Sequence, residues 1–350
     1  MSERTLKIGN LTAKIPVVQG GMGVGISLSQ LAGAVAKAGG VGVISTAQIG
    51  FRDKDYAHDP LSCNLRAIGS EIKKARDIAP EGVIGVNIMV ATLHYEDYVR
   101  AAVKAGADIV ISGAGLPMNL PELTAGSQTK IAPIVSSNKA LSVITRQWER
   151  KYSRIPDMVV IEGPMAGGHL GFSEKQLAEM TVQDFDREVV EIIKSVRELE
   201  KRYETKIPVV VGGGVFERED MEHYLSLGAD GVQIATRFVA TDECDAAKEY
   251  KEAYIHAKKE DIMIIKSPVG MPGRAVRNLF LDRVLSGERI MSSCRQCIKT
   301  CNPATTPYCI TKALINAAIG NVDEGLIFCG SNVDRVKEIV PVEKIMEEFA

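Results

Sequence analysis

Short runs of β-branched and other apolar residues alternate along the first two thirds of the chain with longer stretches of helical periodicity. Each short run is almost continuously apolar, which is typical of strands that are buried on both faces of a sheet. Eight such runs predict strands at Pro16–Gly20, Val41–Ser45, Val83–Val90, Asp108–Ser112, Ile131–Ser136, Asp157–Ile161, Ile207–Gly212 and Gly231–Ala235.

Amphipathic segments separate several of these runs and predict helices. They lie at Leu28–Ala38, Ser62–Ala79, Tyr95–Ala105, Asp184–Lys201 and Glu217–Leu227. Ser27 is the expected N-cap of the first helix, and Gly39-Gly40 ends it. Strands that alternate with helices predict a parallel sheet with right-handed crossovers. Eight units in about 240 residues favour a closed (β/α)8 TIM barrel, an α/β fold, over an open doubly wound sheet.

One short phrase occurs twice between predicted helices and strands. Ala105–Asp108 and Leu227–Asp230 both contain Gly-Ala-Asp. In each case the glycine ends a helix and the next strand follows at once, so we interpret the repeat as a helix C-cap and a short loop. It supports the barrel and does not indicate a functional site.

The pattern changes from about Thr241 onward. A helix-like segment at Cys244–Lys258 precedes a stretch rich in proline and glycine at Ile262–Pro272. Further helices are predicted at Arg274–Ser286, Ile310–Ile319 and near Pro341–Phe349. We therefore expect a barrel at 1–240, a helical cap or lid at 241–330, and a C-terminal helix at 331–350 that packs back on the barrel.

Composition excludes several classes of protein. The 350 residues are 45% hydrophobic and 25% charged, which is typical of a globular chain and excludes a disordered one. Lys and Arg number 42 against 44 Asp and Glu, so we expect no nucleic-acid partner. The stretch Ile15–Lys37 is too rich in glycine and polar residues to span a membrane, and the N-terminus lacks the apolar core of a signal peptide. We expect a cytoplasmic protein whose seven cysteines are reduced or bind metal.

The loops that follow the predicted strands carry unusual residues, and in a barrel these loops hold the chemistry. A glycine-rich run, Gly20–Gly25, follows the first strand and allows a planar ligand to approach the backbone. Gly212-Gly213-Gly214 follows the seventh strand, and Thr236 follows the eighth. Barrels often bind phosphate between these two loops, so we expect a phosphate-bearing cofactor or substrate.

His169 follows the sixth strand within Glu162–Gly171, where small residues surround it. An imidazole at the active end of a barrel can exchange a proton near neutral pH, which makes His169 the candidate catalytic residue. The other histidines lack such surroundings and are expected on the surface; they are His58, His94, His223 and His256.

Four segments in order, "PVVQGGMG", "GPMAGGHLG", "VVVGGGV" and "GVQIATRF", resemble the nitronate monooxygenase or 2-nitropropane dioxygenase family. They are also similar to the flavin-dependent enoyl-acyl-carrier-protein reductase of the same superfamily. The match runs from Ile8 to Ala240, and the terminal "GLIFCG" to "VPVEKIM" resembles the family's last segment. The resemblance implies an FMN-binding barrel with His169 as the active-site histidine. It implies that the residues near FMN are Gly21, Met22, Gly23, Asn87, Ser112, Ser136, Glu162, Gly168, Gly212, Gly213, Gly214, Gln233, Ala235 and Thr236.

The resemblance leaves the substrate open. Met165 stands where the family often has glutamate, and Ala235 where it often has glycine. The implied activity is oxidation of alkyl nitronates or nitroalkanes, with His169 as proton acceptor and FMN as redox centre. The alternative is an NAD(P)H-dependent enoyl-thioester reductase. A barrel that grips a substrate phosphate without flavin, and a catalytically silent flavin-binding subunit, also stay open, as does a homodimer.

Four cysteines lie close together in the predicted cap. Cys294, Cys297, Cys301 and Cys309 fall within 16 residues and predict a metal site, either a [4Fe–4S] cluster or zinc. Their spacing is similar to the iron–sulfur motif of dienoyl-reductase-like and trimethylamine-dehydrogenase-like flavoenzymes. The alternative is a set of free thiols that packs the cap. A cluster would pass electrons to FMN one at a time and would favour a reductase.

Overall fold

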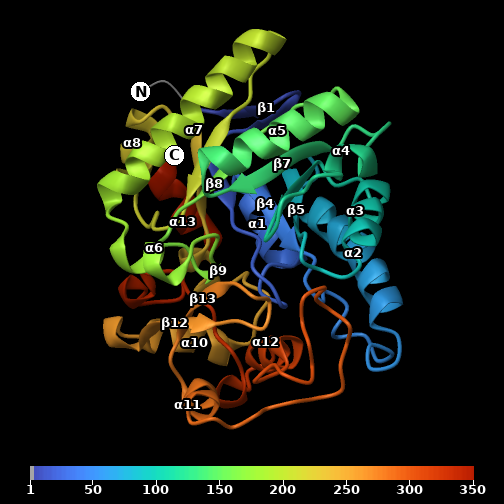
Figure 1. Cartoon of the computed structure of the whole chain (residues 1–350), viewed down its shortest axis with the longest axis vertical. Helices are drawn as coiled ribbons and strands as arrows, with labels where there is room; N and C mark the ends of the chain where they lie inside the picture. Colours follow the sequence, from blue (N-terminus) through green and yellow to red (C-terminus); the bar gives the residue numbers. More distant parts are fainter. Residues whose placement is uncertain (1–3) are drawn as a thin grey trace.

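The computed structural model of the chain describes residues 4–350, and its centre is a closed barrel of eight parallel strands (Figure 1). The strands follow one another around the barrel in chain order, and the last pairs with the first. The TIM barrel prediction is therefore confirmed. The strands are β3 (Val17–Gln19), β4 (Val41–Ser45), β5 (Val83–Met89), β6 (Ile109–Gly113), β7 (Lys130–Val135), β8 (Val159–Glu162), β10 (Val209–Gly212) and β11 (Gly231–Ile234).

Helices surround this barrel and bury the outward-facing side chains of the strands. In β4, Val43 points into the barrel whereas Ile44 packs against the helices, as the alternation of side chains along a strand requires. The helices of the barrel are α1 (Ser29–Lys37), α2 (Pro60–Ile78), α3 (Tyr95–Lys104), α4 (Leu120–Leu123), α5 (Asn138–Tyr152), α6 (Glu174–Glu179), α7 (Val182–Tyr203), α8 (Arg218–Ser226) and α9 (Thr236–Val239).

The hydrophobic pattern did not reveal α5. Its buried side chains, which include Leu141 and Ile144, are separated by many polar residues. Trp148 is fully buried on this helix and donates its indole N–H to the carbonyl oxygen of Pro117 at 3.0 Å. Trp148 therefore packs the core.

The start of α1 differs from the prediction. Ser27 does not cap the helix, because its hydroxyl accepts hydrogen bonds from the Gln19 side chain and the Met22 amide. The carboxylate of Asp245 accepts from the amides of Leu28 and Leu31 instead, at 2.8 and 3.2 Å. A residue 217 positions away thus caps the helix, which no local pattern could show.

An N-terminal hairpin closes the end of the barrel where the strands begin. Its strands are β1 (Leu6–Ile8) and β2 (Leu11–Ala13). Leu6 and Ile8 are buried in the same cluster as Val41 and Val83, which are the first residues of β4 and β5. Ligands therefore have access to the barrel interior from the opposite end.

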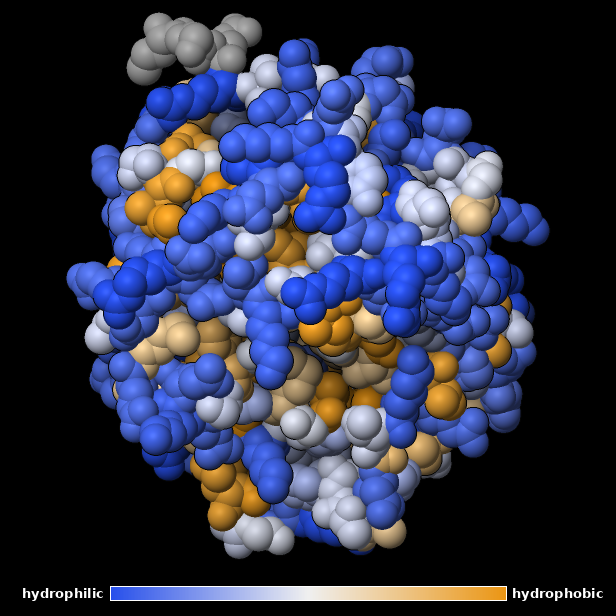
Figure 2. Space-filling model, turned by 45° about the horizontal axis from the view of Figure 1, so that its top comes forward, coloured by the Kyte–Doolittle hydropathy of each residue, from blue (hydrophilic) through white to orange (hydrophobic). Residues whose placement is uncertain are grey.

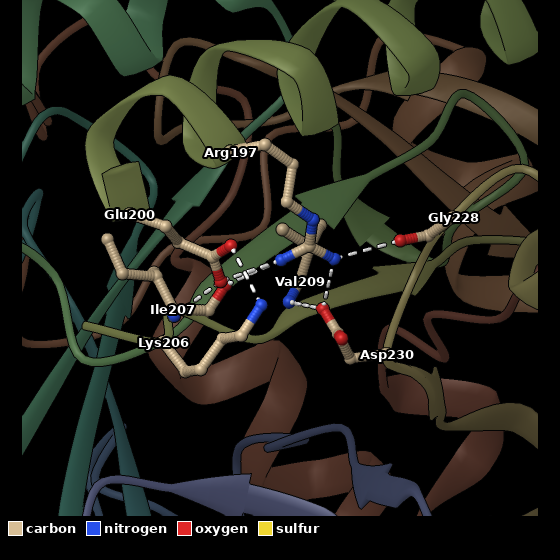
Figure 3. Close-up of polar contacts among 7 residues, drawn as sticks. All are labelled: Arg197, Glu200, Lys206, Ile207, Val209, Gly228 and Asp230. Atoms are coloured by element: carbon tan, nitrogen blue, oxygen red, sulfur yellow. Dashed lines mark hydrogen bonds and ion pairs between the residues drawn. The ribbon is translucent and has the colours of Figure 1, made fainter. Parts of the chain in front are cut away.

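The aspartates of the repeated Gly-Ala-Asp phrase tie adjacent strands together at this closed end. Asp230 accepts from the amide of Val209 at 2.8 Å and pairs with Arg197 at 2.7 Å, and Glu200 lies on the other side of the same guanidinium (Figure 3). Asp108 does the same with the amide of Ile84 and with Arg76. The structural interpretation of the repeat is consistent with these contacts.

The cap, residues 241–330, lies over the other end of the barrel (Figure 1). Its helices are α10 (Lys248–His256), α11 (Leu279–Leu285) and α12 (Ile310–Ala318), and α13 (Val342–Phe349) packs beside α1 after it. The cap is not purely helical, because β12 (Ile262–Lys266) and β13 (Pro272–Val276) form a hairpin. The predicted helix from Arg274 begins only at Leu279, after Asn278 as N-cap.

The face shown in Figure 2 and the helices of the described residues bear on whether the chain could span a membrane. On the face that Figure 2 shows, hydrophilic residues predominate and apolar residues form separate patches. Within residues 4–350, no helix combines the length and apolar character that a bilayer crossing requires.

Candidate active site

A cavity of about 360 Å³ lies between the cap and the barrel, at the carboxyl ends of the strands. The loops after most of the barrel strands line it, as do the cap and the segment Phe328–Asn332. Its walls bring together most of the residues that the sequence analysis singled out. These are Gly21, Met22, Gly23, Asn87, Ser136, Glu162, Gly168, His169, Gly213, Gly214, Gln233, Ala235 and Thr236.

The structure does not bring two of those residues into the cavity. Ser112 is fully buried, and its hydroxyl lies 2.8 Å from the carbonyl oxygen of Ile88 and 3.0 Å from the Tyr95 hydroxyl. It lies on the outward side of β6, because Ile111 before it points into the barrel. Gly212 is also outside the lining, and its carbonyl accepts from the amide of Gly163 at 2.9 Å.

The glycine-rich loop after β3 forms one wall. The buried side chain of Gln19 anchors it, donating to the Ser27 hydroxyl at 2.8 Å and accepting from the amide of Val43 at 2.9 Å. A Cβ atom on Gly21 would lie 2.3 Å from the Cβ of Asn87. Only glycine fits at that position, so backbone atoms form the wall and leave room for a flat ligand.

The loops after β10 and β11 form the far end of the cavity. Gly213 has a φ of +96°, and a Cβ there would lie 2.9 Å from the carbonyl oxygen of Gly163. The Asn332 side chain donates to the carbonyl oxygen of Gly214 at 2.7 Å and fixes the loop. The hydroxyl of Ser331 is buried without a hydrogen-bond partner. An unpartnered hydroxyl beside a glycine turn suits an anionic oxygen atom.

His169 reaches the cavity on a short strand that pairs with the cap hairpin. β9 (Gly168–His169) pairs with β13, so that His169 lies opposite Gly273. The Nε2 atom of His169 lies 2.7 Å from the hydroxyl oxygen of Ser267, and the ring of Phe328 meets the imidazole edge-on at 4.9 Å. Burial disfavours the imidazolium and lowers the pKa of His169 to about 4. The ring is therefore neutral at pH 7 and can accept a proton.

Glu162, the last residue of β8, lines the same cavity. Burial raises the pKa of its carboxyl group to about 7, so protonated and ionised forms coexist near neutral pH. Two groups with shifted pKa values in one cavity are typical of an active site.

Several lining residues escaped the sequence analysis. Tyr250, Met271 and Leu314 come from the cap, and they line the cavity only because the cap folds over the barrel. Ser331 lies just after the terminal "GLIFCG" segment, whose resemblance to the family was the one signal that could have found it.

The cysteine cluster lies apart from this cavity. Cys294 is exposed and Cys297, Cys301 and Cys309 are partly buried, all as free thiols. Across residues 4–350, no group of three or more His, Cys, Asp or Glu side chains is placed to hold a metal ion. The iron–sulfur or zinc site therefore stays a prediction to which the structure gives no support.

Comparison with known proteins agrees with the fold. The chain is 26% identical over 304 residues to the probable nitronate monooxygenase of Staphylococcus saprophyticus subsp. saprophyticus, and the match covers 81% of each chain. It is similar to the structure of FabK from Thermotoga maritima, with a TM-score of 0.73 and 26% identity over 96% of this chain and 92% of that one. The nitroalkane oxidase of Streptomyces ansochromogenes, with a TM-score of 0.69 and 20% identity over 96% of this chain and 95% of that one, shares the fold. The nitronate monooxygenase family pattern matches residues 4–350, so the chain belongs to this family of FMN-dependent oxidoreductases.

Proposed function

We propose that this protein oxidises nitroalkanes and alkyl nitronates, with FMN as redox cofactor and His169 as the proton acceptor for nitroalkanes. The observation that carries the proposal is the neutral imidazole of His169 in the same cavity as the glycine loops. Membership of the nitronate monooxygenase family supports it.

The cavity fits FMN in three respects. The loop at Gly21 and the turn at Gly213 line the cavity without side chains, which suits the close approach of a tricyclic ring and of a phosphate. The buried hydroxyl of Ser331 lacks a partner that a phosphate oxygen would supply. Gly213, Thr236 and Ser331 would hold the phosphate, and Gly21 with Asn87 would contact the ring. Bound FMN would supply a two-electron acceptor.

The protein's own groups then handle the proton. His169 takes the α-proton of the nitroalkane, and the electron pair of the broken C–H bond stays on the substrate as a nitronate. The imidazolium that forms is paired with the negative charge of the nitronate, which offsets the cost of charging a buried ring. Glu162, when protonated, can donate a hydrogen bond to a nitro oxygen.

A second candidate is an NAD(P)H-dependent enoyl-thioester reductase on the same barrel. The cap side of the cavity favours it, because Met271, Leu314 and Phe328 form an apolar wall that suits an acyl chain. Met165, beside Gly214, adds a further uncharged side chain to the lining where the family often has a carboxylate.

The decisive experiment compares a nitroalkane with its preformed nitronate. In protein loaded with FMN, we expect His169→Asn to slow nitroethane oxidation by about 10²–10⁴-fold, because the proton acceptor is lost. Turnover of ethyl nitronate, which has already lost that proton, should fall far less. Oxygen consumption measures both reactions, and His58→Asn, an exposed histidine outside the cavity, is the matched control.

Two results would overturn the proposal. Equal nitroethane rates in wild type and His169→Asn would remove His169 from the reaction. Oxidation of NAD(P)H that depends on a crotonyl thioester, without turnover of either nitro compound, would establish the second candidate instead.

A further inference from the structure

We propose that Ser267, a residue of the cap, positions His169 by holding Nε2, so that Nδ1 is the nitrogen that receives the substrate proton. This inference rests on the proposed function, because it assigns the reacting atom of the same histidine. It adds a residue that neither the sequence motifs nor the family resemblance singled out.

Ser267 is fixed before any substrate binds. It is 3% exposed and follows directly after β12, at the start of the turn that leads to β13. Its amide donates to the carbonyl oxygen of Met271 at 3.2 Å, and its own carbonyl accepts from Gly270 at 2.9 Å. The hydroxyl oxygen lies 2.7 Å from Nε2 of His169. The same hairpin also pairs with β9, so the backbone and the side chain of His169 are held by one element.

The hydrogen bonds around Ser267 indicate which ring nitrogen is free. Nε2 is engaged by Ser267, whereas no protein atom of residues 4–350 forms a hydrogen bond with Nδ1. Nδ1 is therefore the ring nitrogen that these contacts leave free for a ligand. The amide of Val269 donates to the Ser267 oxygen at 3.3 Å, and a hydroxyl oxygen has a second lone pair for an N–H from Nε2.

The hydrogen bond to Ser267 stabilises protonated His169 more than neutral His169. With its proton on Nε2, His169 has an unprotonated Nδ1 that can accept from a C–H acid. Once Nδ1 is protonated, the bond from Nε2–H to Ser267 has a charged donor, and such bonds are about twice as strong as neutral ones. Ser267 therefore stabilises the state after proton transfer more than the state before it.

Other charged or titratable groups near His169 do not occupy either ring nitrogen. Glu162 lines the same cavity from β8, and Cys329 lines it from the last residues of the cap. Arg274, opposite Gly168 on β13, donates to the carbonyl oxygen of Ala166. Ser267 is thus the protein group that holds the imidazole by a side-chain hydrogen bond.

The first test reads the tautomer directly and needs no substrate. Long-range ¹H–¹⁵N spectra of protein with labelled histidine distinguish the two tautomers, and the spectrum of His169→Asn identifies the His169 signals. We expect the Nε2–H form at pH 7 in the wild type and in Ser267→Thr, and a mixture in Ser267→Ala. An Nδ1–H form in the wild type would overturn the proposal, even if His169 proves essential for turnover.

The second test separates positioning from packing. We expect Ser267→Ala to lower kcat for nitroethane about 3–10-fold with little change in KM, since one net hydrogen bond contributes about 0.5–1.5 kcal/mol. Ser267→Thr should restore kcat. Ethyl nitronate turnover should not change in either variant, because that substrate gives up no α-proton.

Thr300→Ala is the matched control. The Thr300 hydroxyl donates to the carbonyl oxygen of Val269 at 3.0 Å, so it supports the same turn without touching His169. We expect its kcat to stay at the wild-type value. If Thr300→Ala lowers kcat as much as Ser267→Ala does, or if Ser267→Thr restores nothing, the serine acts only through hairpin packing and the proposal fails.

Discussion

One residue of the cavity lining, Gly213, allows the loops after β8 and β10 to pack closely together. An added Cβ would lie 2.9 Å from the carbonyl oxygen of Gly163 and 3.1 Å from the amide nitrogen of Ala166. We expect Gly213→Ala to weaken FMN binding at least 10-fold, because the two loops would have to move apart. Fluorescence titration of the apoprotein with FMN measures this change.

Gly287 provides the control for Gly213. Its φ of +93° matches that of Gly213, but an added Cβ there would meet no atom within 4 Å. Gly287→Ala therefore carries the same dihedral strain without the contact at the loops, and it should leave FMN affinity unchanged. Equal losses in the two variants would show that strain alone, and not the close approach at the site, is responsible.

The sequence predicts those site residues that stand in a recognisable local motif. His169 stands between glycines after a strand, so its place was predictable. Ser267 was not predictable, because its partner His169 lies 98 residues away in the chain, and Ser331 reaches the cavity only through the fold. Ser112 was wrongly predicted to lie near FMN. Side chains along a strand point alternately into and out of the barrel, and Ser112 points outward.

At the scale of elements, the aspartates at the closed end of the barrel each join two strands and an arginine. Asp230 accepts from the Val209 amide and pairs with Arg197, which also contacts Glu200. We expect Asp230→Ala to lower the free energy of unfolding by about 1.5–3 kcal/mol, since hydrogen bonds to a charged group are lost together. Urea denaturation followed by the fluorescence of Trp148 measures it.

A surface ion pair serves as the comparison for Asp230. Glu222 pairs with Arg4 at 2.5 Å, but both side chains are largely exposed. Glu222→Ala should cost less than about 1 kcal/mol, as is typical of exposed pairs. If Asp230→Ala lowers the free energy of unfolding as little as Glu222→Ala does, the aspartate does not stabilise the barrel. The Gly-Ala-Asp repeat would then serve only to form the loop between helix and strand.

The elements that the sequence predicted best are the eight strands, whose observed bounds fall within two residues of the expected ones at every end. Their continuous apolar runs allow no other environment than the inside of a covered sheet. The hairpin β12–β13 was missed because proline and glycine hid its alternation. α5 was missed because its apolar positions are sparse among charged ones.

For the molecule as a whole, Asp245 connects the cap to the glycine-rich wall of the site. Its carboxylate caps α1 at Leu28 and Leu31, directly after the loop that follows β3. We expect Asp245→Ala to cost about 1–2 kcal/mol of stability and to weaken FMN binding, because the loop loses its anchor at the helix start. Thermal unfolding with and without FMN measures both effects.

Asp59→Ala is the control that separates the loss of stability from the loss of FMN affinity. Asp59 caps α2 locally, accepting from the amide of Ser62 at 3.0 Å, and it does not line the FMN cavity. It should show a similar loss of stability with unchanged FMN affinity. If FMN affinity also stays unchanged in Asp245→Ala, the cap does not organise the ring-binding wall.

The pairing of β9 with the cap hairpin places His169 and the hairpin that covers the cavity in one hydrogen-bonded sheet. If the hairpin moved away from the barrel, the paired strand β9 would move with it and His169 would leave the cavity. Access to the cavity and the position of His169 are therefore coupled through the strand pairing. A substitution in the turn between β12 and β13 would therefore alter the position of His169 as well as the shape of the cavity, because Ser267 and β13 both contact that histidine.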